Sequence, residues 1–121
     1  MTTNVSLPIY RDVTCKAGDT FNFNFVLKDK TGYITTPRYL TGYTASGAVS
    51  TRPRDGVLVE SMVFSSSLGD LILGIISMRI EAEDTAEIDP GTYYYDIYVD
   101  GDGDVTTYFE GKFIVEARIT P

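Results

Sequence analysis

Carboxylates near the end of the chain are the residues whose type and spacing come closest to a chemical site. Asp100-Gly-Asp-Gly-Asp104 has an aspartate at every second position, and calcium binds carboxylate oxygens supplied by alternate positions of a flexible loop. An EF-hand loop counted from Asp100 would need glycine at Val105 and glutamate at Gly111. Turn chemistry explains the segment instead, because glycine tolerates positive φ and aspartate caps turns. We predict a hairpin tip and no metal site, and calcium binding by Asp100, Asp102 and Asp104 stays open.

A second pair of carboxylates, Asp96 and Glu110, is expected to face each other across the strands of that hairpin. Two such groups can act as acid and base on a glycosidic bond. Seventeen acidic residues among 121 make facing pairs frequent by chance, and no second feature of a glycosidase accompanies this one. The sequence therefore predicts a protein that is not an enzyme and has no catalytic residue.

Missing residue types exclude most familiar catalysts. The chain has no histidine, which rules out Ser-His-Asp and Cys-His nucleophiles and removes the commonest zinc ligand. The single cysteine, Cys15, cannot form an intramolecular disulfide and is expected to pack in or near a strand. Gly101 and Gly103 precede a strand and not a helix, so they do not form a phosphate loop. We predict no cofactor.

Tyrosine and phenylalanine are abundant, with nine and six residues. Tyrosine offers a large contact area with a polar tip, so tyrosines on the face opposite the core favour an interaction surface. The alternative is that aromatic residues simply favour strands and pair across them. The residues predicted for the interaction surface are Tyr94, Tyr98 and Tyr108.

Period-two alternation of apolar residues predicts the strands that position these side chains. An edge strand is expected within residues 1–19, where Pro8 lies, and a loop over 33–41, where Pro37 would break a strand. A short connection is expected over 65–70, and residues 81–87 are the one segment with the composition of a helical turn. Six further strands are predicted: 20–29, 43–49, 57–64, 71–80, 93–99 and 105–115.

The closing hairpin shows the alternation most clearly. Tyr93, Tyr95, Ile97 and Val99 are expected to point inward, opposite Tyr94, Asp96 and Tyr98. On the return strand, Phe109, Gly111 and Phe113 are expected to point the opposite way from Tyr108, Glu110 and Lys112.

Together these segments predict an all-β fold, namely an antiparallel β-sandwich, Ig-like in layout, with about seven strands and at most one short helical turn. No stretch offers the long crossover helices that parallel strands require. The antibody pattern of two cysteines around a tryptophan is absent, since the chain has no tryptophan. At 121 residues the chain has the size of one domain, so 1–121 is predicted to be a single β-sandwich domain.

The net charge of -7 disfavours nucleic acid and anionic membranes as partners, because both would repel the protein. The first twenty residues contain no apolar block of signal-peptide length. The longest apolar run, Leu71–Ile76, is far shorter than the roughly twenty residues of a membrane span and is read as a buried strand. Synthesis in a cytoplasm is expected.

Six short motifs follow one another along almost the whole chain. They are Lys16-Ala-Gly-Asp-Thr-Phe21, Leu27-Lys-Asp-Lys-Thr-Gly32, Leu40-Thr-Gly-Tyr-Thr44, Ala86-Glu-Ile-Asp-Pro-Gly-Thr-Tyr-Tyr-Tyr-Asp-Ile97, Gly111-Lys-Phe-Ile-Val115 and Ile119-Thr-Pro121. In order and spacing, these motifs resemble the small β-sandwich domains of tailed-phage tail and baseplate proteins. Domains of that kind form the N-terminus of baseplate upper and fibre-attachment proteins.

This resemblance implies a virion structural or docking protein without catalysis, located in the particle. Its partners would be other virion proteins and further copies of itself in a symmetric assembly. Relatives of this kind continue beyond the position of Pro121, so either a small virion protein or an attachment domain fits. The alternative function is a module that binds carbohydrate or another ligand through the three tyrosines and nearby carboxylates.

Overall fold

The computed structural model describes residues 7–119, and ten strands and two short helices occupy most of this range. The predicted all-β class is confirmed, with more strands than the expected seven and one more helix than expected. In chain order the elements are β1 (Ile9–Tyr10), β2 (Val13–Lys16), β3 (Phe21–Val26), β4 (Lys28–Thr31), β5 (Ile34–Pro37), β6 (Thr44–Ser50), β7 (Leu58–Phe64), α1 (Leu68–Ile72), β8 (Ile75–Ile80), α2 (Ala82–Thr85), β9 (Gly91–Gly101) and β10 (Asp104–Glu116).

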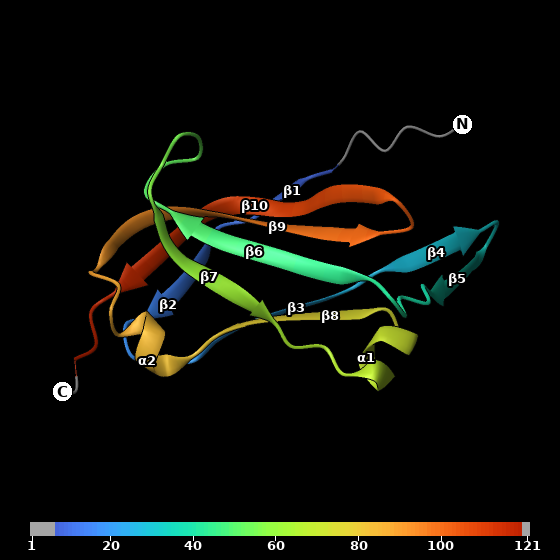
Figure 1. Ribbon diagram of the computed structural model, residues 1–121, viewed down its shortest axis with the longest axis horizontal. Helices are drawn as coiled ribbons and strands as arrows, with labels where there is room; N and C mark the ends of the chain where they lie inside the picture. Colours follow the sequence, from blue (N-terminus) through green and yellow to red (C-terminus); the bar gives the residue numbers. More distant parts are fainter. Residues whose placement is uncertain (1–6, 120–121) are drawn as a thin grey trace.

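Eight of the strands form one curled sheet in the order β1-β10-β9-β6-β7-β8-β3, and β2 also pairs with β10. The ladder between β7 and β8 consists of two pairs, Val63 with Arg79 and Phe64 with Met78. In Figure 1 the sheet folds over at β7, so that β8 and β3 lie beneath β6, β9 and β10. Because hydrogen bonding is continuous around this fold, the two separate sheets of the predicted sandwich are not confirmed.

The expectation that all strands are antiparallel is wrong at one edge of the sheet. β1 and β2 both run parallel to β10, with Ile9 beside Phe109 and Val13 beside Phe113. A tight turn forces antiparallel pairing only between strands that it joins directly. Here most of the chain separates β1 and β2 from β10, so no turn sets their direction.

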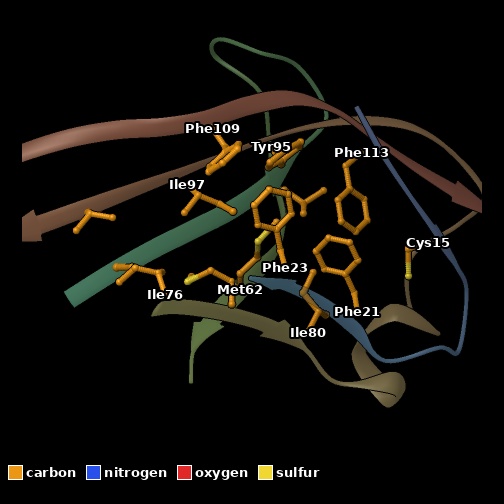
Figure 2. Close-up of a cluster of buried hydrophobic side chains, with 14 of the residues drawn as sticks. Cys15, Phe21, Phe23, Met62, Ile76, Ile80, Tyr95, Ile97, Phe109 and Phe113 are labelled. Carbon is orange, nitrogen blue, oxygen red and sulfur yellow. The ribbon is translucent and has the colours of Figure 1, made fainter. Parts of the chain in front are cut away.

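The core lies between the two curled halves of the sheet. The Phe21 and Phe113 rings meet edge to face with centroids 4.9 Å apart, and Phe23 and Phe109 meet at the same separation. Figure 2 shows these rings and Tyr95 above the aliphatic side chain of Ile80. Each such aromatic pair contributes roughly 0.5–1.5 kcal/mol beyond the burial of its area. The inward faces predicted for the strands around residues 21, 45 and 97 are confirmed, as is the burial of Cys15.

The predicted hairpin tip between β9 and β10 is confirmed. Gly101 pairs with Asp104, which leaves Asp102 and Gly103 as a two-residue loop, with φ of 54° and 80°. Positive φ at both positions is what a type I′ turn requires, and Asp-Gly is a favoured sequence for it. A β-bulge follows between Thr107 and Phe109. The bulge shifts the alternation predicted for the return strand, because one extra residue reverses the face on which the preceding side chains lie.

Two further predictions are wrong. The segment 33–41, expected to be a loop, contains β5, which pairs with β4 from Lys28–Pro37 to Thr31–Ile34. A two-stranded ribbon has free edges on both sides, so Pro37 can lie in it without breaking a ladder. Leu71–Ile76 is not one buried strand, because α1 includes Leu71 and Ile72, and β8 begins only at Ile75. α2 confirms the helical turn expected over 81–87.

The β4–β5 ribbon, which we call the arm, projects from one end of the molecule (Figure 1). Its two roots are Leu27 and Leu40, both buried in the core. The Leu27 N–H donates to the Gly74 carbonyl at 2.8 Å, and the Leu40 N–H donates to the Leu71 carbonyl at 2.9 Å. A Cβ on Gly74 would lie 2.5 Å from the Leu27 oxygen, so only glycine permits this close crossing. The core therefore fixes the base of the arm.

Candidate interaction surfaces

A groove with a volume of about 660 Å³ lies on the outer face of the sheet, and we call it the outer groove. Its floor comes from β9 and β10, where Asp96 is paired directly with Glu110. The prediction that these two carboxylates face each other is confirmed. Tyr10 of β1 lies at one side, and the loop 51–56 forms the other wall. The charged and aromatic residues that line the groove are Tyr10, Asp12, Arg52, Arg54, Asp55, Tyr94, Tyr95, Asp96, Glu110 and Lys112.

The two carboxylates on the groove floor are electrostatically unfavourable for the folded chain. Partial removal from water, and then the negative charge of Glu110, raise the pKa of Asp96. Hydrogen bonding to Glu110, and then its charge, raise the pKa of Tyr10. None of the ion pairs within residues 7–119 includes Asp96 or Glu110. The floor therefore has negative charge that no cation of the described chain neutralises at ion-pair distance.

The loop 51–56 is a closed turn. The Thr51 N–H donates to the Val57 carbonyl at 3.0 Å, and the Val57 N–H donates to the Thr51 hydroxyl at 3.0 Å. A Cβ on Gly56 would lie 2.6 Å from the Arg52 nitrogen, so glycine lets the two ends of the turn approach. This turn places Arg52 and Arg54 in the wall of the groove.

The structure does not bring the three predicted interaction tyrosines together. Tyr94 lies half-buried in the outer groove, opposite Lys112. Tyr98 is exposed on the same face, four residues along β9, which is roughly 14 Å in a strand. Tyr108 is the extra residue of the bulge and packs against Phe25 at the margin of the core, with ring centroids 6.2 Å apart. Sequence alternation could not have placed Tyr108, because nothing in the pattern marks the bulge.

A second hollow, of about 490 Å³, lies between the arm and the tip of the β9–β10 hairpin. The Arg38 Nε–H donates to Asp29 at 3.0 Å, and its terminal nitrogen donates to the Tyr108 hydroxyl at 3.4 Å. The Tyr43 hydroxyl donates to the Asp102 carboxylate at 2.5 Å. These polar groups form hydrogen bonds with one another between the arm and the β9–β10 hairpin. We call this region the joint, and its hydrogen bonds support the arm.

The Asp100–Asp104 segment is part of this joint. Residues 7–119 include no group of three or more His, Cys, Asp or Glu side chains arranged to hold a metal ion. The absence of a metal site stays a prediction. No helix in this range is long and apolar enough to span a bilayer.

The arm is the interaction feature that sequence reasoning missed. At its turn Tyr33 is fully exposed, with a relative accessibility of 105%, and Ile34 is 66% exposed. Burying such side chains in water-excluding contacts is the main favourable term in protein association. A signal was present in Lys30-Thr-Gly-Tyr-Ile-Thr-Thr36, in which a glycine turn precedes tyrosine and β-branched residues. Pro37 instead favoured the prediction of a loop over 33–41, because proline breaks the ladder of a central strand.

Two surfaces of the molecule therefore combine aromatic and charged side chains: the outer groove and the exposed arm. Comparisons with protein-family models and with curated proteins find no match for this chain.

Proposed function

We propose that the protein is a non-catalytic structural or docking component of a tailed-phage particle and that it acts by protein–protein assembly. One observation carries the assembly part: the arm is held firmly at its base and presents Tyr33 and Ile34 to solvent. A fixed element with large apolar side chains at its tip is suited to insertion into another protein surface. The motif resemblance described above supports the virion setting.

Further exposed apolar side chains support the same proposal. Ile9 and Tyr10 of β1 are 45% and 76% exposed, at the edge of the sheet. An edge strand has unpaired backbone groups that can add to a neighbouring sheet. The proposal includes an immunoglobulin-like, two-layered body, with β3 and β8 as one layer and β6, β9 and β10 as the other. Its partners would be other virion proteins and further copies of this chain.

Proteomic analysis of purified virus particles tests the virion part of the proposal. Peptides of this chain should co-purify with intact particles through a density gradient, at a stoichiometry fixed between preparations. Their absence from particles made by a host that expresses the gene would contradict the proposed location. A purified recombinant protein with a measurable turnover of any substrate would contradict the non-catalytic assignment.

The outer groove favours one second candidate function, carbohydrate binding. Tyr10 and Tyr94 flank a pair of carboxylates, and aromatic rings with nearby polar groups suit the two faces of a sugar ring. Calorimetric titration with oligosaccharides, compared between the wild type and Tyr94→Ala, tests this candidate. A strictly monomeric protein that binds a saccharide through Tyr94 would favour it over assembly.

A further inference from the structure

We propose that the arm of one copy docks into the outer groove of a second copy, so that the chain associates head to tail. This inference rests on the proposed assembly function and names the partner and both contact surfaces. The occupant of the groove would be the turn of the arm, with Tyr33, Ile34 and Lys30. The following observations support it.

The arm and the groove lie toward opposite ends of the molecule. In Figure 1 the arm extends beyond the right-hand end of the sheet, whereas the loop 51–56, which walls the groove, lies at the left. Leu27 and Leu40 anchor the roots of the arm in the core, so the arm cannot fold back onto its own groove without disrupting those contacts. The arm can therefore enter the outer groove only of another copy. A contact between two different surfaces of identical chains is heterologous and builds either a ring or a filament.

The charges of the two surfaces are complementary. Lys28 and Lys30 lie exposed on the arm, and no carboxylate within residues 7–119 is at ion-pair distance from either. The third charged residue of β4, Asp29, already binds Arg38. The groove floor presents Asp96 and Glu110, directly opposite each other and equally without a cation. Like charges opposite each other in a ladder are destabilising, so a lysine from a neighbouring copy would relieve a repulsion present in the isolated chain.

The net charge of -7 strengthens this argument, because two acidic copies repel in most orientations. An approach that places the lysines of one arm over the acidic floor is attractive, because opposite charges meet there. Arg52 and Arg54 of the wall and Lys112 of β10 also line the groove, so the attractive region is restricted to the part of the floor around Asp96 and Glu110. Electrostatic complementarity of this kind fixes the register of an interface more than its strength.

Apolar contacts provide the affinity in this arrangement. Tyr33 and Ile34 are the most exposed apolar pair of adjacent residues on the arm, and Tyr10 and Tyr94 line the groove. A volume of about 660 Å³ is in the range that holds a compact ligand and is sufficient for the side chains of one β-turn. Aromatic anchors that enter a pocket are the usual energetic centre of an interface.

Charge reversal tests the pairing directly. Lys30→Glu and Glu110→Lys should each weaken self-association by about tenfold or more, measured by sedimentation velocity, because each places like charges together. The double variant should recover association to within about threefold of the wild type. Val105→Ser, which truncates an exposed side chain outside both surfaces, is the matched control and should associate as the wild type does. Circular dichroism melts would show that all variants fold.

Mixing tests the head-to-tail geometry. A variant with a defective arm (Tyr33→Ser, Ile34→Ser) and one with a defective groove (Glu110→Lys) should each be monomeric alone, yet form a one-to-one dimer together. If the wild type associates and the Glu110→Lys variant associates equally well, this inference is wrong. The proposed assembly function would still stand in that case. A monomeric wild type would overturn this inference, whereas docking to other virion proteins is tested separately by the proteomics of purified particles. A groove occupied by a saccharide in a monomer would also overturn it, because the occupant would then be a different one.

Discussion

Arg11 is the residue whose backbone fixes the rim of the outer groove. Its N–H donates to the Glu110 carbonyl at 2.8 Å, and its carbonyl accepts from the Tyr95 hydroxyl at 2.6 Å. The next residue, Asp12, accepts from the Lys112 N–H at 3.0 Å. Burial raises the pKa of Tyr95 to about 12, so this hydroxyl remains a donor throughout the neutral range. The connection between β1 and β2 is therefore held close against β10.

Gly111 makes this close approach possible, and its substitution should be costly. A Cβ at position 111 would lie 2.7 Å from the Arg11 carbonyl carbon and still closer to its oxygen. We expect Gly111→Ala to lower the free energy of unfolding by about 1–3 kcal/mol, the usual cost of overpacking. Urea denaturation checks this value. Gly69→Ala is the control, because its Cβ would have its nearest neighbour at 3.8 Å, and it should leave stability unchanged or slightly higher.

Substitution of Asp96 should raise the free energy of unfolding, whereas substitution of Gly111 lowers it, because the ionised form of Asp96 is disfavoured in the folded chain. A folded-state pKa above the ordinary value means that ionisation weakens folding as the pH rises through the acidic range. Asp96→Asn should therefore raise the free energy of unfolding at pH 7 by about 0.2–1 kcal/mol, the size of a cross-strand pair effect. The gain should fall as the pH drops through the raised pKa of Asp96, because the protonated side chain carries no charge for the substitution to remove. A gain that persisted at pH 3, or an equal gain for Asp100→Asn, would show that the partly buried charge of Asp96 beside Glu110 is not the cause.

Individual elements differ in how far the sequence determines them. The strands around Phe21, Val49 and Ile97 follow from alternation alone, since each has one buried face. The β9–β10 hairpin follows from its Asp-Gly turn. The bulge before Phe109, the continuity of the sheet across β7 and the parallel pairing of β1 and β2 depend on contacts between distant residues, which no local pattern contains. For that reason the facing pair of the groove floor could be predicted, whereas the groove walls and the position of Tyr108 could not. The single-domain organisation stays a prediction.

Helix α1 is an element whose local signal was overlooked. The Ser67 hydroxyl accepts from the Asp70 N–H at 3.1 Å, and the Asp70 carboxylate accepts from the Ser67 N–H at 3.0 Å. This reciprocal pair is a capping box, which marks the start of a helix even before apolar residues of strand-like composition.

Ser67→Ala should therefore lower the free energy of unfolding by about 1 kcal/mol, because one amide at the start of the helix loses its acceptor. The midpoint of urea denaturation measures the change. Ser61→Ala, at an exposed serine of β7, provides the comparison and should shift the midpoint little. An equal loss in both variants would mean that the cap does not stabilise α1.

At the scale of the whole molecule, the curled sheet separates two features that each lack a complement within the described chain. One end has an arm with exposed apolar and basic side chains, and the outer face toward the other end has a groove with an acidic floor. The core fixes both, since Leu27 and Leu40 anchor the arm and the β9–β10 ladder forms the floor. We infer that the placement of the arm and the groove at opposite ends is the basis of assembly. The net charge restricts the orientations in which copies meet.

The molar mass in solution, measured by light scattering over a wide range of protein concentration, tests assembly through the arm most directly. The wild type should rise from the monomer mass of 13.4 kDa toward multiples of it as concentration increases. The Tyr33→Ser, Ile34→Ser variant should remain near the monomer mass over the same range while keeping its fold. A wild type that stays at 13.4 kDa up to its solubility limit, or an arm variant that associates as strongly as the wild type, would contradict this account.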